Sequence, residues 1–109
     1  MAPDPPDLDV HTTYLGDTAT VVVAGEIDLA TSTKLNRELD AVLDRVPAPM
    51  RLRIDLGAVG FMDTSGVAVL LKARRRAREA RCRFTVTSTS HTLTRLFEIT
   101  GLTALLADE

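Results

Sequence analysis

The hydrophobic residues of this chain repeat with two different periods, and the order of those periods limits the folds that it can adopt. Leu52, Ile54 and Leu56 alternate with charged residues, as in a strand with one buried face. The segments on either side place apolar residues three or four positions apart, which is typical of helices with one buried face. A strand between two helices predicts parallel strand–helix–strand units with right-handed crossovers.

The whole chain divides into elements in the order β-β-α-β-α-β-α. Leu15-Gly16-Asp17 joins the first two strands and predicts an antiparallel hairpin, because glycine and aspartate favour tight turns. The later strands pair in parallel, so we expect one mixed sheet in an α/β domain. The expected ranges are strands over 8–14, 18–24, 51–56 and 83–87, helices over 31–46, from Thr64 or Ser65 to about Ala80, and from Thr89 or Ser90 to Gly101, with loops at 25–28 and 57–63.

The two longer helices each carry a stripe of apolar residues. Asp28, Thr31 or Ser32 can cap the first helix, and Pro47 stops it. The small residues of the second stripe allow that helix to lie close to a sheet. The stripes are Leu35, Leu39, Val42 and Val46 in the first helix, and Gly66, Leu70, Ala73 and Ala77 in the second.

Length and composition favour a single globular domain. The chain has 109 residues, of which 45% are hydrophobic and 26% charged. We expect a flexible, proline-rich tail over 1–7 and one domain over 8–109. Cys82 is the only cysteine, and no apolar run approaches the roughly 20 residues of a membrane span. We therefore expect a cytoplasmic protein that forms no disulfide within its chain and engages no membrane.

The segment from Lys72 to Arg83 is strongly basic, although the net charge of the chain is −2. It contains seven basic side chains and one acidic side chain, Glu79. Such a patch can attract nucleic acid or anionic lipid, but exposed helix faces are often charged, and we favour that interpretation. No zinc-ligand spacing and no set of stacking aromatics accompanies it, so we expect no direct binding to nucleic acid.

Most catalytic sites are disfavoured. Ser65 follows a strand and opens a helix, as in a nucleophile elbow, but Asp63 stands where the elbow requires glycine. No pattern connects His11 or His91 to this serine as a general base. The chain also lacks a phosphate loop and any metal-ligand spacing. We expect neither an enzyme nor a protein with a cofactor or metal.

The junction Asp63-Thr64-Ser65-Gly66 has two interpretations. Aspartate, threonine and serine are common helix N-caps, because their oxygens accept hydrogen bonds from free backbone N–H groups. The same N–H groups and the helix dipole also tolerate added negative charge. A phosphate on Ser65 would therefore leave its helix intact and would place about −2 charge beside Asp63.

Three segments resemble, in order and spacing, those of the anti-sigma factor antagonists of the STAS domain family. They are Gly25–Thr31, Ile54–Val67 and Leu93–Leu102, and the resemblance extends over about 8–106. It implies a sheet whose helices pack mainly on one face. It also implies that the unphosphorylated protein binds an anti-sigma factor that is a serine kinase, and so frees a sigma factor. The kinase phosphorylates the antagonist with ATP and Mg²⁺, and a PP2C-type phosphatase restores it.

The resemblance assigns roles to individual residues. Ser65 matches the phosphoacceptor, and Thr64, which replaces a serine common in relatives, is a second permitted acceptor. Gly25, Glu26 and Asp28 match a loop of the partner-binding surface. The acceptor site is implied to be shaped by Asp63 and Gly66.

Two questions remain open from the sequence. Phe61 and Met62 either pack beneath their loop or contribute to a partner interface, where such residues are enriched. The alternative function is a constitutive STAS subunit of a lipid-transport ATPase complex or of a stressosome-like scaffold. In that alternative Ser65 is only a helix cap. A small serine hydrolase is a third class.

Overall fold

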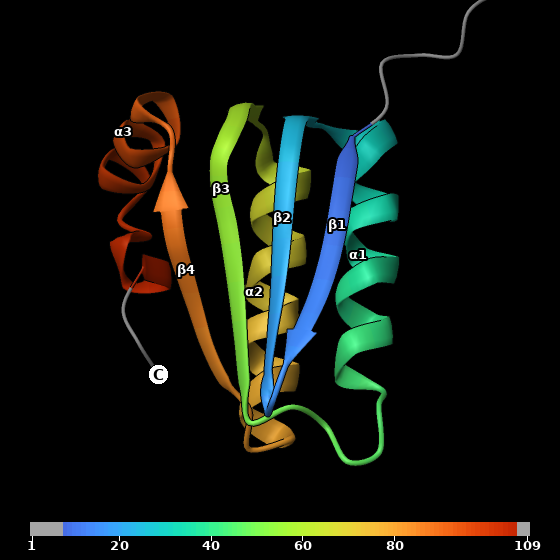
Figure 1. Cartoon of the computed structure of the whole chain (residues 1–109). Helices are drawn as coiled ribbons and strands as arrows, with labels where there is room; N and C mark the ends of the chain where they lie inside the picture. The colour runs from blue at the N-terminus through green and yellow to red at the C-terminus, as the bar shows by residue number, and fades with distance from the viewer. Residues whose placement is uncertain (1–7, 107–109) are drawn as a thin grey trace, which may run out of the picture.

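A four-stranded mixed sheet forms the centre of the computed structural model, which describes residues 8–106. The strand order is β1-β2-β3-β4, with β1 antiparallel to β2 and the other neighbours parallel (Figure 1). This confirms the predicted sheet. The predicted tail over 1–7 lies outside the described residues, as does the end of the predicted domain at 107–109. The strands are β1 (Asp9–Leu15), β2 (Thr18–Ile27), β3 (Arg51–Met62) and β4 (Arg83–Thr89).

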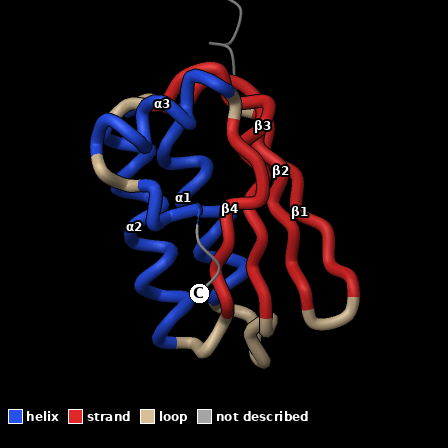
Figure 2. Tube along the Cα trace, turned by 90° about the vertical axis from the view of Figure 1, so that its left-hand side faces the viewer, coloured by secondary structure: helices blue, strands red, loops and turns tan. Residues whose placement is uncertain are grey.

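The helices cover one face of the sheet, as predicted. Figure 2 shows them on one side of the strands, and the other face is left bare. The elements are α1 (Leu29–Leu43), α2 (Thr64–Glu79), α3 (His91–Thr100) and the short 3-10 helix η1 (Thr103–Leu106). None of the helices between residues 8 and 106 is long and apolar enough to cross a membrane.

The core fills the space between α1, α2 and the covered face of the sheet. The alternating residues of β3 point into it, because Leu52, Ile54 and Leu56 are fully buried. Both predicted helical stripes are buried except at Val46, which is 96% exposed. That prediction was wrong because α1 ends at Leu43, and Leu43 is the last apolar residue that the helix buries.

The helix ends follow from local hydrogen bonds. Asp28 caps α1, so this helix begins two residues before the predicted start. Ser90 caps α3, and Gly101 ends it in the left-handed conformation with φ of 75°, which glycine adopts without strain.

Two predicted loops are parts of strands. Residues 25–27 continue β2 and residues 57–62 continue β3, and the two segments pair in parallel as far as Ile27 and Met62. The glycines in both segments suggested breaks. The pairing instead absorbs them by shifting register, and Gly25 adopts a φ of 118° at one shift.

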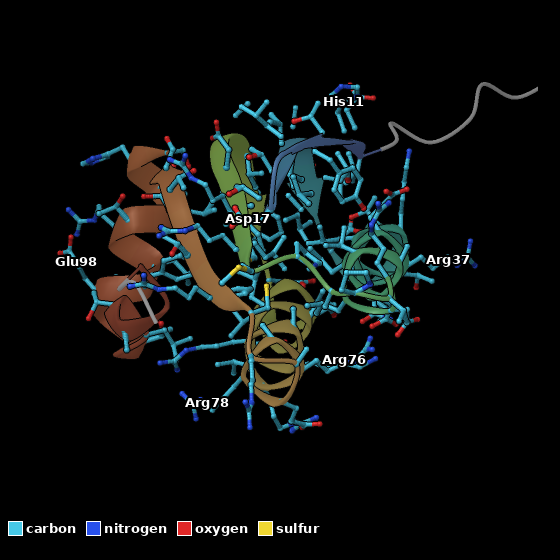
Figure 3. The ribbon with its side chains drawn as sticks, turned by 60° about the horizontal axis from the view of Figure 1, so that its bottom comes forward. His11, Asp17, Arg37, Arg76, Arg78 and Glu98 are labelled. Atoms are coloured by element: carbon cyan, nitrogen blue, oxygen red, sulfur yellow. The ribbon has the colours of Figure 1, made fainter. Side chains whose placement is uncertain are left out.

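Part of the basic segment binds α1. The Arg76 guanidinium pairs with the carboxylates of Asp40 and Asp44, and Lys72 Nζ lies 3.7 Å from Asp40 Oδ2. These groups are partly exposed, so each pair contributes at most about 1 kcal/mol. Figure 3 shows Arg76 directed toward α1 and Arg78 directed away from it. The basic segment is therefore divided between two flanks of α2.

Leu70 and Leu71 give a matched test of this core. Leu70 is fully buried and its neighbour Leu71 is 41% exposed. Leu70→Ala should lower the free energy of unfolding by about 2–5 kcal/mol, because it leaves a cavity. Leu71→Ala, with the same change in chemistry, should cost less than about 1 kcal/mol. Urea denaturation measures both values, and equal losses would contradict the assigned orientation of α2.

Candidate functional site

Two strand–helix junctions lie side by side at one end of the sheet. Because β2 and β3 are parallel, α1 and α2 both begin at the same sheet edge, at the upper end of Figure 1. Ile27 pairs with Met62, and the Asp63 N–H donates to the Ile27 carbonyl at 3.0 Å. The fold thus brings together the segments Gly25–Asp28 and Phe61–Gly66, which the sequence separates by more than 30 positions.

Aspartates cap both helices at this end. Asp63 Oδ1 accepts a hydrogen bond from the Ser65 N–H at 2.8 Å, so Asp63 is the N-cap and α2 begins at Thr64. At the other junction, Asp28 Oδ1 accepts from the Thr31 N–H at 2.9 Å, and Thr31 Oγ1 accepts from the Asp28 N–H at 2.9 Å. The Thr31 N–H stabilises the carboxylate and so lowers the pKa of Asp28. The prediction that Thr64 or Ser65 opens α2 is therefore confirmed, and of the cap candidates at this junction Asp63 is the one that caps the helix.

Ser65 is the second residue of α2 and is half-buried on the flank that meets α1. The evidence is the register between the two helices. Lys72 Nζ donates to Asn36 Oδ1 at 3.3 Å, and Arg76 pairs with Asp40 four residues further along both helices. Seven residues earlier, about two helical turns, the same register sets Ser65 opposite Leu29. Ser65 therefore lies on the flank of α2 that faces the start of α1, whereas Thr64 is exposed.

Gly66 allows α2 to start this close to the strands. A Cβ atom at this position would lie 2.6 Å from Met62 Cγ and 2.7 Å from Ile27 Cγ2. The Ile27 methyl group belongs to a β-branched side chain that has little freedom to move. Glycine is consequently required by packing here, not by an unusual backbone conformation.

The surface around Ser65 combines carboxylates with exposed apolar side chains. Phe61 is 46% exposed and pairs with exposed Glu26, while Met62 is 4% exposed and lies in the core. The two interpretations therefore apply to different residues: the Phe61 side chain is exposed, and the Met62 side chain packs against Gly66. Leu29 is 77% exposed and was missed from the sequence. The sequence nevertheless indicated that Leu29 is exposed, because it lies seven residues before Asn36, on the polar flank of its helix.

The other residues considered for chemistry lie elsewhere. His11 is on β1 and His91 is the first residue of α3. The hydrogen bonds of the described part of the chain do not join either histidine to Ser65. Within residues 8–106 there is no group of three histidine, cysteine or acidic side chains placed to hold a metal ion. What the site does offer is a half-buried serine hydroxyl at an end of the sheet that also carries acidic and exposed apolar side chains.

Known proteins share this fold and parts of this sequence. Residues 10–107 match a family model described as "Mlab, STAS domain". An anti-sigma-B factor antagonist of Listeria monocytogenes is 37% identical over 86 residues, which is 79% of this chain and 74% of that protein, and the Listeria innocua antagonist matches equally.

Solved structures extend the likeness to the whole domain. An anti-sigma factor antagonist from Mycobacterium paratuberculosis has a TM-score of 0.79 at 28% identity, covering 96% of this chain and 86% of that one. Unphosphorylated SpoIIAA, an anti-sigma factor antagonist, has a TM-score of 0.76 at 20% identity, covering 93% and 88%. At that identity the likeness to SpoIIAA concerns the fold alone.

The packing around Gly66 predicts an unusual result for glycine replacement in a helix. Alanine normally stabilises a helix by about 1 kcal/mol relative to glycine. Here the added methyl group must displace Ile27 or Met62, so Gly66→Ala should lower the free energy of unfolding by about 1–2 kcal/mol. Gly60→Ala is the control, because a Cβ there meets nothing within 4 Å. Thermal or urea unfolding that shows a more stable Gly66→Ala variant would contradict this packing.

The Asp28 cap predicts a pH dependence. Its pKa is lower in the folded chain than in the unfolded chain, so its stabilising effect is complete above the unfolded value, about 4. The effect is lost as the pH falls through the folded value. Asp28→Asn keeps an oxygen acceptor but removes the charge. The free energy of unfolding of this variant should therefore fall less than that of wild type between about pH 5 and pH 3. Identical acid dependence in the two proteins would contradict the charged cap.

Proposed function

This chain belongs to the STAS domain family, and on that premise we propose that it is an anti-sigma factor antagonist controlled by phosphorylation of Ser65. Unphosphorylated, it binds an anti-sigma factor that is a serine kinase and so releases a sigma factor. The kinase uses ATP and Mg²⁺ to phosphorylate Ser65, and the complex separates. A PP2C-type phosphatase reverses the modification. A cytoplasmic location is part of the proposal.

The position of Ser65 is the observation that carries this proposal. The side chain belongs to the first turn of α2, at the end of the sheet where α1 also begins, and it is half-buried. A phosphate there adds about −2 charge next to Asp63, in a region that already contains Glu26 and Asp28. The relatives named as anti-sigma factor antagonists support the choice of partner class.

The surface around the serine supports a docking role. Glu26, Phe61 and Thr64 are exposed at this end of the sheet, together with Leu29. Gly25 and Asp28 hold the first junction in shape, and Asp63, Met62 and Gly66 hold the second. A partner that covers Ser65 would exclude water from its hydroxyl group. A phosphate in that position opposes docking, because a charged group loses hydration without gaining a partner.

The test combines modification with binding. Incubation with the cognate anti-sigma factor kinase, ATP and Mg²⁺ should place phosphate on Ser65, as read by peptide mass spectrometry. In calorimetric titrations Ser65→Asp should bind the kinase at least about tenfold more weakly than wild type, a change of about 1.4 kcal/mol. Ser65→Ala should bind as wild type does. Thr92→Asp is the matched control, because Thr92 is the exposed second residue of α3.

Several outcomes would contradict the proposal. Phosphate on Thr64 with Ser65 unmodified would show that the acceptor is wrongly assigned. Equal affinity of Ser65→Asp and wild type would remove the switch and favour a constitutive STAS subunit. Labelling of Ser65 by an active-site serine probe would indicate a hydrolase instead.

A further inference from the structure

The bare face of the sheet carries opposite charges along its third strand. Arg51, Arg53 and Asp55 alternate with the buried residues of β3, so their side chains project from the bare face, which is turned toward the viewer in Figure 1. The two arginines come first, toward the lower end of the sheet, and the aspartate follows them along the strand. The charge along β3 therefore changes from positive to negative between Arg53 and Asp55.

Small side chains lie beside this change of charge. Arg53 pairs with Thr20 of β2, and Asp55 pairs with Val22. Thr20 pairs in turn with Thr13 of β1. Val22 is 39% exposed although it lies on a central strand, and covering an exposed apolar side chain is favourable. The centre of the bare face is thus low enough for a second protein surface to approach it closely.

Arg53 and Asp55 can both bind a group from outside the chain. Within residues 8–106 the Arg53 guanidinium makes no hydrogen bond or ion pair. Asp55 lies two residues away, about 6.6 Å along the strand, and its Oδ1 accepts from the Gly57 N–H at 2.9 Å. This bond leaves the carboxylate charged, and a carboxylate can accept several hydrogen bonds.

The face is complementary to itself in one orientation. When two copies stack face to face about a two-fold axis perpendicular to the strands, each β3 runs antiparallel to the other. With the axis at the level of Ile54, Arg53 of each copy lies over Asp55 of the other, and Val22 lies over Thr20. A two-fold axis parallel to the strands would instead leave the arginines of both copies at the same end, where like charges repel. Only the first orientation gives the self-complementary patch that a two-fold dimer requires.

The dimensions of the face predict how strong such a contact is. Stacked sheets lie about 10 Å apart, a gap that a long arginine side chain and a short aspartate bridge together. Four strands about 4.8 Å apart, with about five residues each at about 3.3 Å per residue, cover roughly 300 Å². A stable complex buries about 800 Å² on each partner. We therefore expect a reversible dimer with a Kd of about 0.1 mM.

We propose that the bare face of the sheet is a dimer interface, on which a second copy of this chain stacks antiparallel through reciprocal Arg53–Asp55 ion pairs. The helices lie on the other side of the sheet (Figure 2), so Ser65 on α2 stays on the outside of the dimer. This interface does not depend on the proposed antagonist function. Ser65→Asp should accordingly dimerise as wild type does.

Sedimentation velocity of the full chain from about 10 μM to about 1 mM tests the proposal. The average mass of wild type should rise with concentration toward that of a dimer. Arg53→Glu and Asp55→Lys should each associate at least about tenfold more weakly, because either change sets like charges against each other. An equimolar mixture of these two variants should associate again, because both opposed pairs of the mixed dimer carry opposite charges.

A matched control and a folding check accompany the variants. Arg75→Glu makes the same change in charge at an exposed position of α2, away from the bare face, and should dimerise as wild type does. Asp55→Lys also removes the acceptor of the Gly57 N–H, so thermal unfolding should be compared among all variants. Amide NMR spectra of wild type at rising concentration need no variant, and their shifts should be largest around Thr20 and Val22.

Three results would overturn the proposal. The first is a wild-type mass that stays that of one chain over the whole concentration range. The second is a mixture of the two folded variants that fails to associate although wild type does, because the ion pairs would then lie elsewhere. The third is a set of concentration-dependent NMR shifts confined to the helices, which would assign the contact to the other side of the molecule.

Discussion

The close contact of Gly66 with Ile27 and Met62 fixes the geometry on which the rest of the site depends. It lets the backbone of α2 rest against the ends of β2 and β3. With the helix seated there, Asp63 can cap it while its own N–H bonds to the Ile27 carbonyl. A side chain at position 66 would have to displace Ile27 or Met62. The position of Ser65 is therefore a consequence of core packing.

Ion pairs between α1 and α2 extend this arrangement along the helices. Lys72 and Arg76 reach Asp40 and Asp44, and so they hold the two helices in register from the middle of each helix to its end. Individually these partly exposed pairs contribute little. Together they help to keep the two helices side by side. The β2–α1 junction and the β3–α2 junction then lie next to each other. Acidic and basic side chains lie at opposite ends of the sheet, with Asp28 and Asp63 at the end of Ser65 and Arg51 and Arg83 at the other.

The sequence predicted the sheet and the helical order well, because alternating and helical periods are local patterns. It failed where local signals conflict with tertiary pairing. Gly25 and the glycines of 57–60 indicated loops, but pairing between β2 and β3 carries both strands through them with shifts of register. Val46 continues the period of α1, yet it lies beyond the end of the helix. Leu29 was overlooked, although its place on the polar flank of α1 indicated that it is exposed.

The sequence by itself determined the order of elements, the buried stripes and the presence of a serine at a strand–helix junction, since each depends on residues close together in the chain. The tertiary structure alone decided that Met62 is buried while Phe61 is exposed, and that Ser65 lies on the flank of α2 that meets α1. It also decided that Arg51 of β3 pairs with Arg83 of β4. These features depend on contacts between residues 30 or more positions apart, and only the packing of parallel strands brings such residues together.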